Sequence, residues 1–180
     1  MTSTMPASGD ATTGAHDRRE LWREATVMVL YVSVVEIAEL AALPEQHYAN
    51  GHVEGVIDGA LLAVIWGTAI GLALAHWFAF GIAAPGLRGA RPTRHHLTAG
   101  LAQFGGAAFV AAVSSLPVLF LTDDAALETI GEIPAGIIGV IAYFVARATG
   151  RKRLPSIIYG ITALALGVVV ALVKYQLGGH

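Results

Sequence analysis

Long apolar stretches alternate with short polar segments along the whole chain. We place five such stretches, at about residues 21–43, 56–84, 97–121, 130–148 and 154–177. Each is close to or above the roughly 20 residues that an α-helix needs to cross about 30 Å of hydrocarbon. Backbone polar groups need partners within lipid, and these stretches lack the strict alternation of barrel strands. The pattern therefore predicts an all-α integral membrane protein, a bundle of five transmembrane helices.

The polar segments divide the chain into a tail and one membrane domain. Residues 1–17 show no apolar periodicity and are expected to form a disordered cytoplasmic tail, with the five-helix domain at 18–180. The first apolar stretch is longer than the core of a signal peptide and lacks its small-residue cleavage pattern, so we interpret it as a retained anchor. Pro117 lies inside the third stretch and is expected to kink it or end it early.

Basic residues indicate how the helices are oriented. Ten of the eleven lie around the start of the first stretch, between the second and third, or around the junction of the fourth and fifth, and Lys174 is the exception. Because cytoplasmic loops carry an excess of Lys and Arg, the N-terminus is expected in the cytoplasm and the C-terminus outside. The predicted location is the plasma membrane, and the Ala-, Gly- and Val-rich composition, with Arg preferred over Lys, favours a bacterial inner membrane.

Composition excludes several classes of protein. Hydrophobic residues make up 55% of the 180 residues and charged residues 13%, with a net charge of -2 and no cysteine. Such a chain has too few polar residues to cover a soluble globule, no basic run suited to nucleic acid, and no disulfide or thiolate site. Hydrolase, metalloprotease and nucleotide-binding motifs are absent, so we expect no enzyme and no cofactor. An intramembrane lipid-modifying enzyme with a metal ion is the third-ranked alternative.

Two carboxyl groups in the first stretch give the strongest functional signal. Glu36 and Glu39 are three residues apart, so they share a helix face, and Ser33 lies one turn before Glu36. An acidic side chain at membrane depth costs roughly 2.5–3.5 kcal/mol, a cost that protonation lowers. Such a pair suits a shared proton or a bound cation. The alternative is that the helix ends early and both groups reach the headgroup region.

The second stretch contributes one acid and one imidazole. Asp58 and His76 are 18 residues apart, which corresponds to five full turns of a regular α-helix and places them on one stripe. Histidine changes charge near neutral pH and suits a gate or relay on an ion pathway. The alternatives are a helix-terminal charge for Asp58 and an interfacial position beside Trp77 for His76.

The predicted outer loops are rich in acids and histidines. His47 and His52 are weak candidates for a divalent metal site, the one metal site that the sequence suggests. Acidic residues in and near these loops would form a negative outer mouth that concentrates cations: Glu54, Asp123, Asp124, Glu128 and Glu132. The alternatives are solvated histidines, and acids left behind by the orientation bias alone.

Small residues recur at helical spacing. The second stretch has Ala63, Gly67, Gly71, Ala75 and Ala79, and similar rows occur in the fourth and fifth. Small residues let helices approach closely in lipid, so the rows predict packing within the bundle and favour a homo-oligomer.

The function that we predict is transport. The leading hypothesis is a small oligomeric channel or proton-linked carrier for protons or other monovalent cations, with Glu36, Glu39, Asp58 and His76 on the path. The alternative is a non-transporting membrane scaffold or regulatory subunit of a larger complex. The lipid bilayer is the expected partner in both cases, and nucleic acid in neither.

Overall fold

The protein is helical throughout the part that the structure describes. This computed structural model describes residues 10–40, 57–88, 94–121, 126 and 129–178, and those residues contain no strand. The α-helices are α1 (Asp10–Leu40), α2 (Leu62–Arg88), α3 (Arg94–Ser114), α4 (Leu116–Phe120), α6 (Glu132–Ala148) and α7 (Arg153–Gly178), and a short π-helix, η2 (Ile57–Leu61), leads into α2. The predicted all-α class is confirmed, and each predicted apolar stretch contains one long helix.

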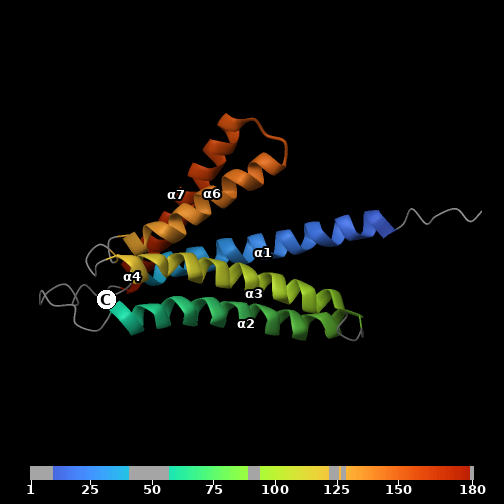
Figure 1. Cartoon of the computed structure of the whole chain (residues 1–180), viewed down its shortest axis with the longest axis horizontal. Helices are drawn as coiled ribbons and strands as arrows, with labels where there is room; N and C mark the ends of the chain where they lie inside the picture. Colours follow the sequence, from blue (N-terminus) through green and yellow to red (C-terminus); the bar gives the residue numbers. More distant parts are fainter. Residues whose placement is uncertain (1–9, 41–56, 89–93, 122–125, 127–128, 179–180) are drawn as a thin grey trace, which may run out of the picture.

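Helices α1, α2 and α3 lie side by side (Figure 1). Glu24 of α1 contacts Gln103 of α3, and Glu36, later in α1, contacts Ser114, later in α3. Helices α1 and α3 therefore run parallel. Trp66 of α2 contacts Ser115 at the end of α3, whereas Trp77, later in α2, contacts Phe104, earlier in α3. Helix α2 is therefore antiparallel to α3. We call the end where α1 begins the basic end, after Arg18, Arg19 and Arg23, and the other end the far end.

Helices α6 and α7 form an antiparallel hairpin that leans away from the other three toward the basic end (Figure 1). Their close approach depends on glycine. A Cβ atom built on Gly160 would lie 2.8 Å from the Gly139 carbonyl oxygen, and one on Gly167 would lie 3.1 Å from Ile138 Cδ1. Gly139, Gly160 and Gly167 therefore pack within the monomer, as expected of glycine at helix crossings.

A single apolar cluster joins the first three helices. It consists of buried residues from α1, η2, α2 and α3, together with Ile130: Met28, Val29, Val32, Leu61, Ile65, Ala69, Ala73, Ala107, Val110, Ala111 and Ile130. From Leu61 to Ala73 the buried positions recur every four residues, so one stripe of this segment faces the neighbouring helices.

The third predicted helix is interrupted at its proline. Pro117 has no N–H to donate to the Val113 carbonyl, and α3 ends at Ser114 while α4 begins at Leu116. Leu119 N still donates to Ser115 O at 3.2 Å, so the chain continues in nearly the same direction. The predicted early end is confirmed, and it falls directly beside two buried serines, Ser114 and Ser115.

The N-terminal boundary differs from the prediction. Helix α1 begins at Asp10, within the segment assigned to a disordered tail. No proline follows Met5–Pro6 before Pro44, so once the apolar part forms a helix its hydrogen-bond pattern continues backward through residues that tolerate it. Residues 1–9 of that tail lie outside the described residues.

Large apolar side chains cover much of the outer surface. Within the described residues, three segments are long and apolar enough to cross a membrane, namely Gly59–Ala79, Leu97–Phe120 and Arg153–Val170. The exposed faces of these segments carry Ile70, Leu74, Phe78, Leu101, Phe109, Ile158, Ile161 and Leu166. A water-soluble protein rarely exposes so much contiguous apolar surface, and the helices therefore have the character of a membrane protein.

The small-residue row of α2 lies on this outer surface. Ala63, Gly67, Gly71, Ala75 and Ala79 are exposed, and a Cβ atom on Gly67 or Gly71 would meet nothing within 4 Å. Unlike the rows of α6 and α7, this row makes no close helix contact within the described part of the monomer.

Candidate functional site

Glu36 is a carboxyl group inside the helical bundle. Its side chain is 1% exposed and lies among the buried residues of α1 that face α3. Ser114 Oγ, at the end of α3, donates a hydrogen bond of 2.7 Å to Glu36 Oε2. The break at Pro117 ends α3 directly after this serine. The end of α3 therefore places the Ser114 hydroxyl, a hydrogen-bond donor, at the same level of the bundle as the Glu36 carboxyl group of α1.

Three side-chain hydrogen bonds at this level join α1, α2 and the α3–α4 junction in pairs. Besides the bond from Ser114 to Glu36, Thr68 Oγ1 of α2 donates to Glu39 Oε2 of α1. Trp66 Nε1 of α2 donates to Ser115 Oγ at 3.1 Å, and that hydroxyl donates to Ala111 O at 2.7 Å. These residues lie at one level of the bundle, and together with Ser33, which precedes Glu36 by one turn of α1, we call them the far polar cluster.

The far polar cluster contains two buried oxygen atoms whose hydrogen-bonding capacity is unused. Glu36 Oε1 and Ser33 Oγ have no hydrogen-bond partner among the described residues. The two residues are three positions apart on α1, so they lie on one helix face. A serine inside a helix usually donates to the carbonyl four residues earlier, and Ser33 does not. A proton on Glu36, or a small donor or cation between the two atoms, would supply the missing interactions.

A second polar contact lies nearer the basic end of the same helix interface. Gln103 is 3% exposed, and its Nε2 donates to Glu24 Oε2 at 2.9 Å. Glu24 also accepts a 3.1 Å bond from Arg23, whose side chain is 72% exposed. Gln103 Oε1 has no hydrogen-bond partner among the described residues. We call Glu24 and Gln103 the near polar pair.

An apolar layer separates the near polar pair from the far polar cluster. Met28 and Val32 of α1 and Ala107 and Val110 of α3 are buried between them, in the common apolar cluster. Glu24 and Glu36 are twelve residues apart on α1, which corresponds to about 18 Å along the helix axis. The two polar sites therefore do not exchange a proton directly in this conformation.

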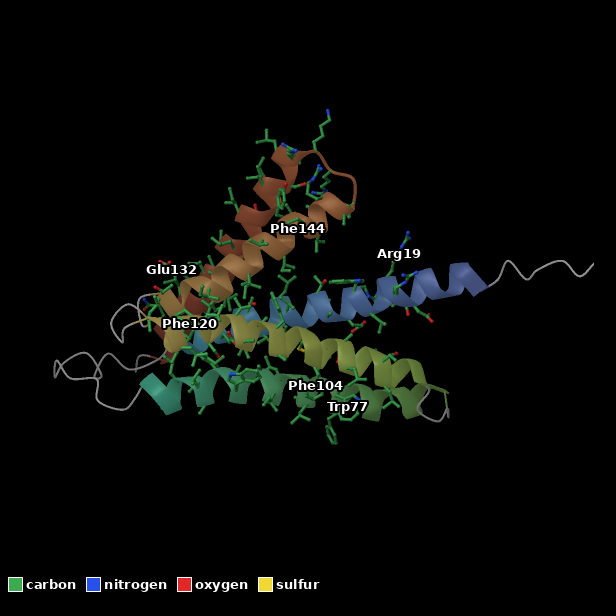
Figure 2. All side chains as sticks on the ribbon, in the orientation of Figure 1. Arg19, Trp77, Phe104, Phe120, Glu132 and Phe144 are labelled. Atoms are coloured by element: carbon green, nitrogen blue, oxygen red, sulfur yellow. The ribbon has the colours of Figure 1, made fainter. Side chains whose placement is uncertain are left out.

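His76 occupies the level of the near polar pair. It follows the buried stripe of α2 three residues after Ala73 and is half-buried. Its neighbour Trp77 packs edge-to-face against Phe104 with ring centroids 6.1 Å apart, and Figure 2 shows these two rings between α2 and α3. Because Phe104 follows Gln103, the backbone of His76 lies at the same height as that amide. The structure separates His76 from the far polar cluster.

The regular α-helix assumed between Asp58 and His76 does not extend to Asp58. Residues Ile57–Leu61 form a π-helix, which has more residues per turn than an α-helix, so five exact turns no longer separate the two positions. The side chain of Asp58 lies outside the described residues. The observed backbone therefore does not place Asp58 and His76 on one stripe of a regular α-helix.

Most of the predicted outer mouth cannot be placed. His47, His52, Glu54, Asp123, Asp124 and Glu128 lie outside the described residues. Glu132 is exposed in the first turn of α6 at the far end, as Figure 2 shows beside Phe120. Within the described part of the chain, no three His, Asp or Glu side chains are grouped so that they could hold a metal ion.

Sequence reasoning missed several members of these sites. From the sequence alone Gln103, Ser114 and Ser115 look like helix-packing groups, and nothing singles out Glu24, Trp66 or Thr68. Gln103 and the serines are polar residues inside an apolar stretch, which is a signal. Glu24 gives no such signal in the sequence, because it lies among charged residues at the start of the first stretch.

Comparison with protein-family models, curated proteins and solved structures finds no match to this chain. The functional argument therefore depends on the geometry of the sites alone.

Proposed function

We propose that this chain is a small multi-pass membrane protein that moves protons or other monovalent cations across the bilayer, with Glu36 on the path. One observation carries the proposal. Glu36 is an almost completely buried carboxyl group, and one of its two oxygens has no partner among the described residues. A buried group that serves packing alone normally has its hydrogen bonds satisfied, whereas a group that accepts and releases a proton needs a free position.

The proposal includes five membrane-spanning helices. Three segments are long and apolar enough by themselves. Helix α6 has 17 residues, about 26 Å of helix, which lies at the lower limit for a span. Helix α1 carries Glu24, Glu36 and Glu39 on the face that meets α2 and α3, and exposes Val27 and Tyr31. Both helices pack against spanning segments, which favours their insertion as part of one bundle.

The number of ligands favours a proton over a desolvated metal cation at this site. Oxygens of Ser33, Glu36, Glu39, Thr68 and Ser114 lie at this level, and among the described residues the buried ones without a partner are Glu36 Oε1 and Ser33 Oγ. Alkali and divalent cations that lose their water need more oxygen ligands than these, whereas a proton needs one acceptor and one hydrogen-bond partner. We therefore expect proton movement to exceed movement of K⁺.

The remaining expectations belong to the same proposal. Basic residues cluster at alternate helix ends, which supports a cytoplasmic N-terminus and an external C-terminus. The acidic far end would then form an outer mouth that attracts cations, in a bacterial plasma membrane. The exposed small-residue row of α2 supports assembly into a homo-oligomer, which chemical cross-linking in membranes would test.

A non-transporting scaffold or regulatory subunit is the second candidate. The polar contacts that favour it are those from Glu24 to Gln103, from Glu36 to Ser114 and from Glu39 to Thr68, because each links α1 to a neighbouring helix. In that case the acids fix helix packing. Removing one of them would change assembly, and neither the wild type nor the variant would move ions.

Flux measurements on purified protein in liposomes separate the two functions. Proton flux and K⁺ flux are measured separately for the wild type, for Glu36→Gln and for the control Glu20→Gln, which lies on the same helix before the predicted span. Transport predicts proton flux in the wild type and in the control, lowered about tenfold or more by Glu36→Gln. No flux from folded, assembled wild type would contradict the proposal and favour the scaffold.

A further inference from the structure

We propose that Glu24 and Gln103 form a second proton-binding site, reached before Glu36 from the basic end, and that the apolar layer between them gates transfer. This inference rests on the proposed transport function and extends it to residues on the other side of that layer. The ligand is a hydrogen-bond donor small enough to enter a helix interface, namely a proton carried by water.

The unpartnered oxygen of Gln103 is the first observation. The amide is 3% exposed, and its nitrogen already donates to Glu24. Because Nε2 needs the carboxylate as acceptor, Oε1 is left as an acceptor inside the interface, without a donor among the described residues. Water or hydronium is the species whose chemistry complements a buried acceptor beside a carboxylate.

Close backbone packing fixes this acceptor in place. A Cβ atom on Gly106 would lie 2.6 Å from the Ala25 carbonyl oxygen, so only glycine permits the observed approach of α3 to α1. Gln103 lies one turn before Gly106, and Glu24 is next to Ala25. The glycine contact therefore holds the amide against the carboxylate and leaves little freedom for the amide oxygen to turn toward bulk water.

The near polar pair also has a connection to water. Glu24 is 19% exposed and pairs with the largely exposed Arg23. Among the described residues, Glu20 on α1 and His76 on α2 are further ionisable side chains near this level, and each makes interactions of its own. A proton arriving at the basic end therefore meets Glu24 before it meets the buried layer.

The layer beyond the pair is apolar and buried. Met28 and Val32 from α1 face Ala107 and Val110 from α3, and all four are buried. Apolar constrictions stop ions because water leaves them, and they conduct when water enters. Met28 is one turn beyond Glu24 and has the most flexible side chain of the four, so its movement would admit water most easily.

The test is the dependence of liposome proton flux on proton concentration. Glu24→Gln keeps an acceptor for the Gln103 amide but removes the charge. The inference predicts that the half-saturating proton concentration rises roughly tenfold, about 1.4 kcal/mol, while thermal stability is unchanged. Glu20→Gln is the matched control.

The apolar layer is tested in the same assay. Met28→Ala is expected to raise maximal proton flux about threefold or more, whereas Val27→Ala, on the exposed side of α1, is expected to leave it unchanged. The inference is overturned if flux depends on Glu36 while Glu24→Gln and Glu20→Gln have the wild-type concentration dependence. An absence of wild-type flux would instead overturn the proposed function, and this inference with it.

Discussion

Ser114 and Glu36 meet across the interface of two parallel helices, where the serine hydroxyl donates to the carboxyl oxygen at 2.7 Å. The two residues are 78 positions apart in the chain, and both side chains are almost fully buried. The serine supplies the one donor found for this carboxyl group within the described residues. The contact therefore links the helix break at Pro117 to the acid on which the proposed function depends.

Removing this donor should destabilise the bundle. Ser114→Ala leaves both oxygens of Glu36 buried without a donor, and we expect a loss of about 1–2 kcal/mol in unfolding free energy. The measurement is thermal or denaturant unfolding in detergent. The control is Ser156→Ala, since Ser156 is equally buried but its hydroxyl donates to Lys152 O of its own segment. Equal losses in the two variants would show that the contact with Glu36 has no special weight.

Two adjacent glycines in α3 should respond oppositely to alanine. Gly106→Ala places a methyl group against the Ala25 carbonyl, and separating α1 from α3 is expected to cost about 1–3 kcal/mol. Gly105→Ala meets open space and is expected to be neutral or to stabilise by about 0.5–1 kcal/mol through helix propensity. Unfolding of both variants under one condition checks the pair. A neutral Gly106→Ala would contradict the close approach of these helices.

The proposed topology can be mapped because the chain has no cysteine. Three exposed positions mark different helix ends: Gly14 in α1, Glu132 in α6 and Thr149 after α6. In intact cells a membrane-impermeant maleimide is expected to label Glu132→Cys, and to label Gly14→Cys and Thr149→Cys only after permeabilisation. Labelling of Gly14→Cys and Glu132→Cys from the same side would rule out the five-span orientation.

The sequence predicts the helices well but their contacts poorly. Continuous apolar stretches specify helices, and Pro117 specifies a break, because both depend on local backbone chemistry. The acid at position 36 was identifiable since a carboxyl group inside an apolar stretch is costly. Its partner Ser114 was not, because helix neighbours and their register depend on tertiary packing that a single sequence does not encode locally.

Two local features also escaped prediction. The π-helix over Ile57–Leu61 changes the register on which the alignment of Asp58 with His76 was calculated. Glu24 resembles the charged residues around it, and its role depends on the contact with Gln103, which becomes visible only when α1 and α3 are packed together. Regular periodicity is a good guide within a helix and a poor one at its ends.

The central claim is that the carboxyl group of Glu36 carries the transported charge. Voltage-driven proton current across a planar bilayer, compared for wild type, Glu36→Asp and Glu36→Gln, tests this most directly. Aspartate keeps an ionisable group on the same helix face, whereas glutamine keeps size and hydrogen bonding but has no proton to exchange. We predict a measurable current with aspartate and a current at least about tenfold lower than wild type with glutamine. A wild-type current in Glu36→Gln would contradict the account.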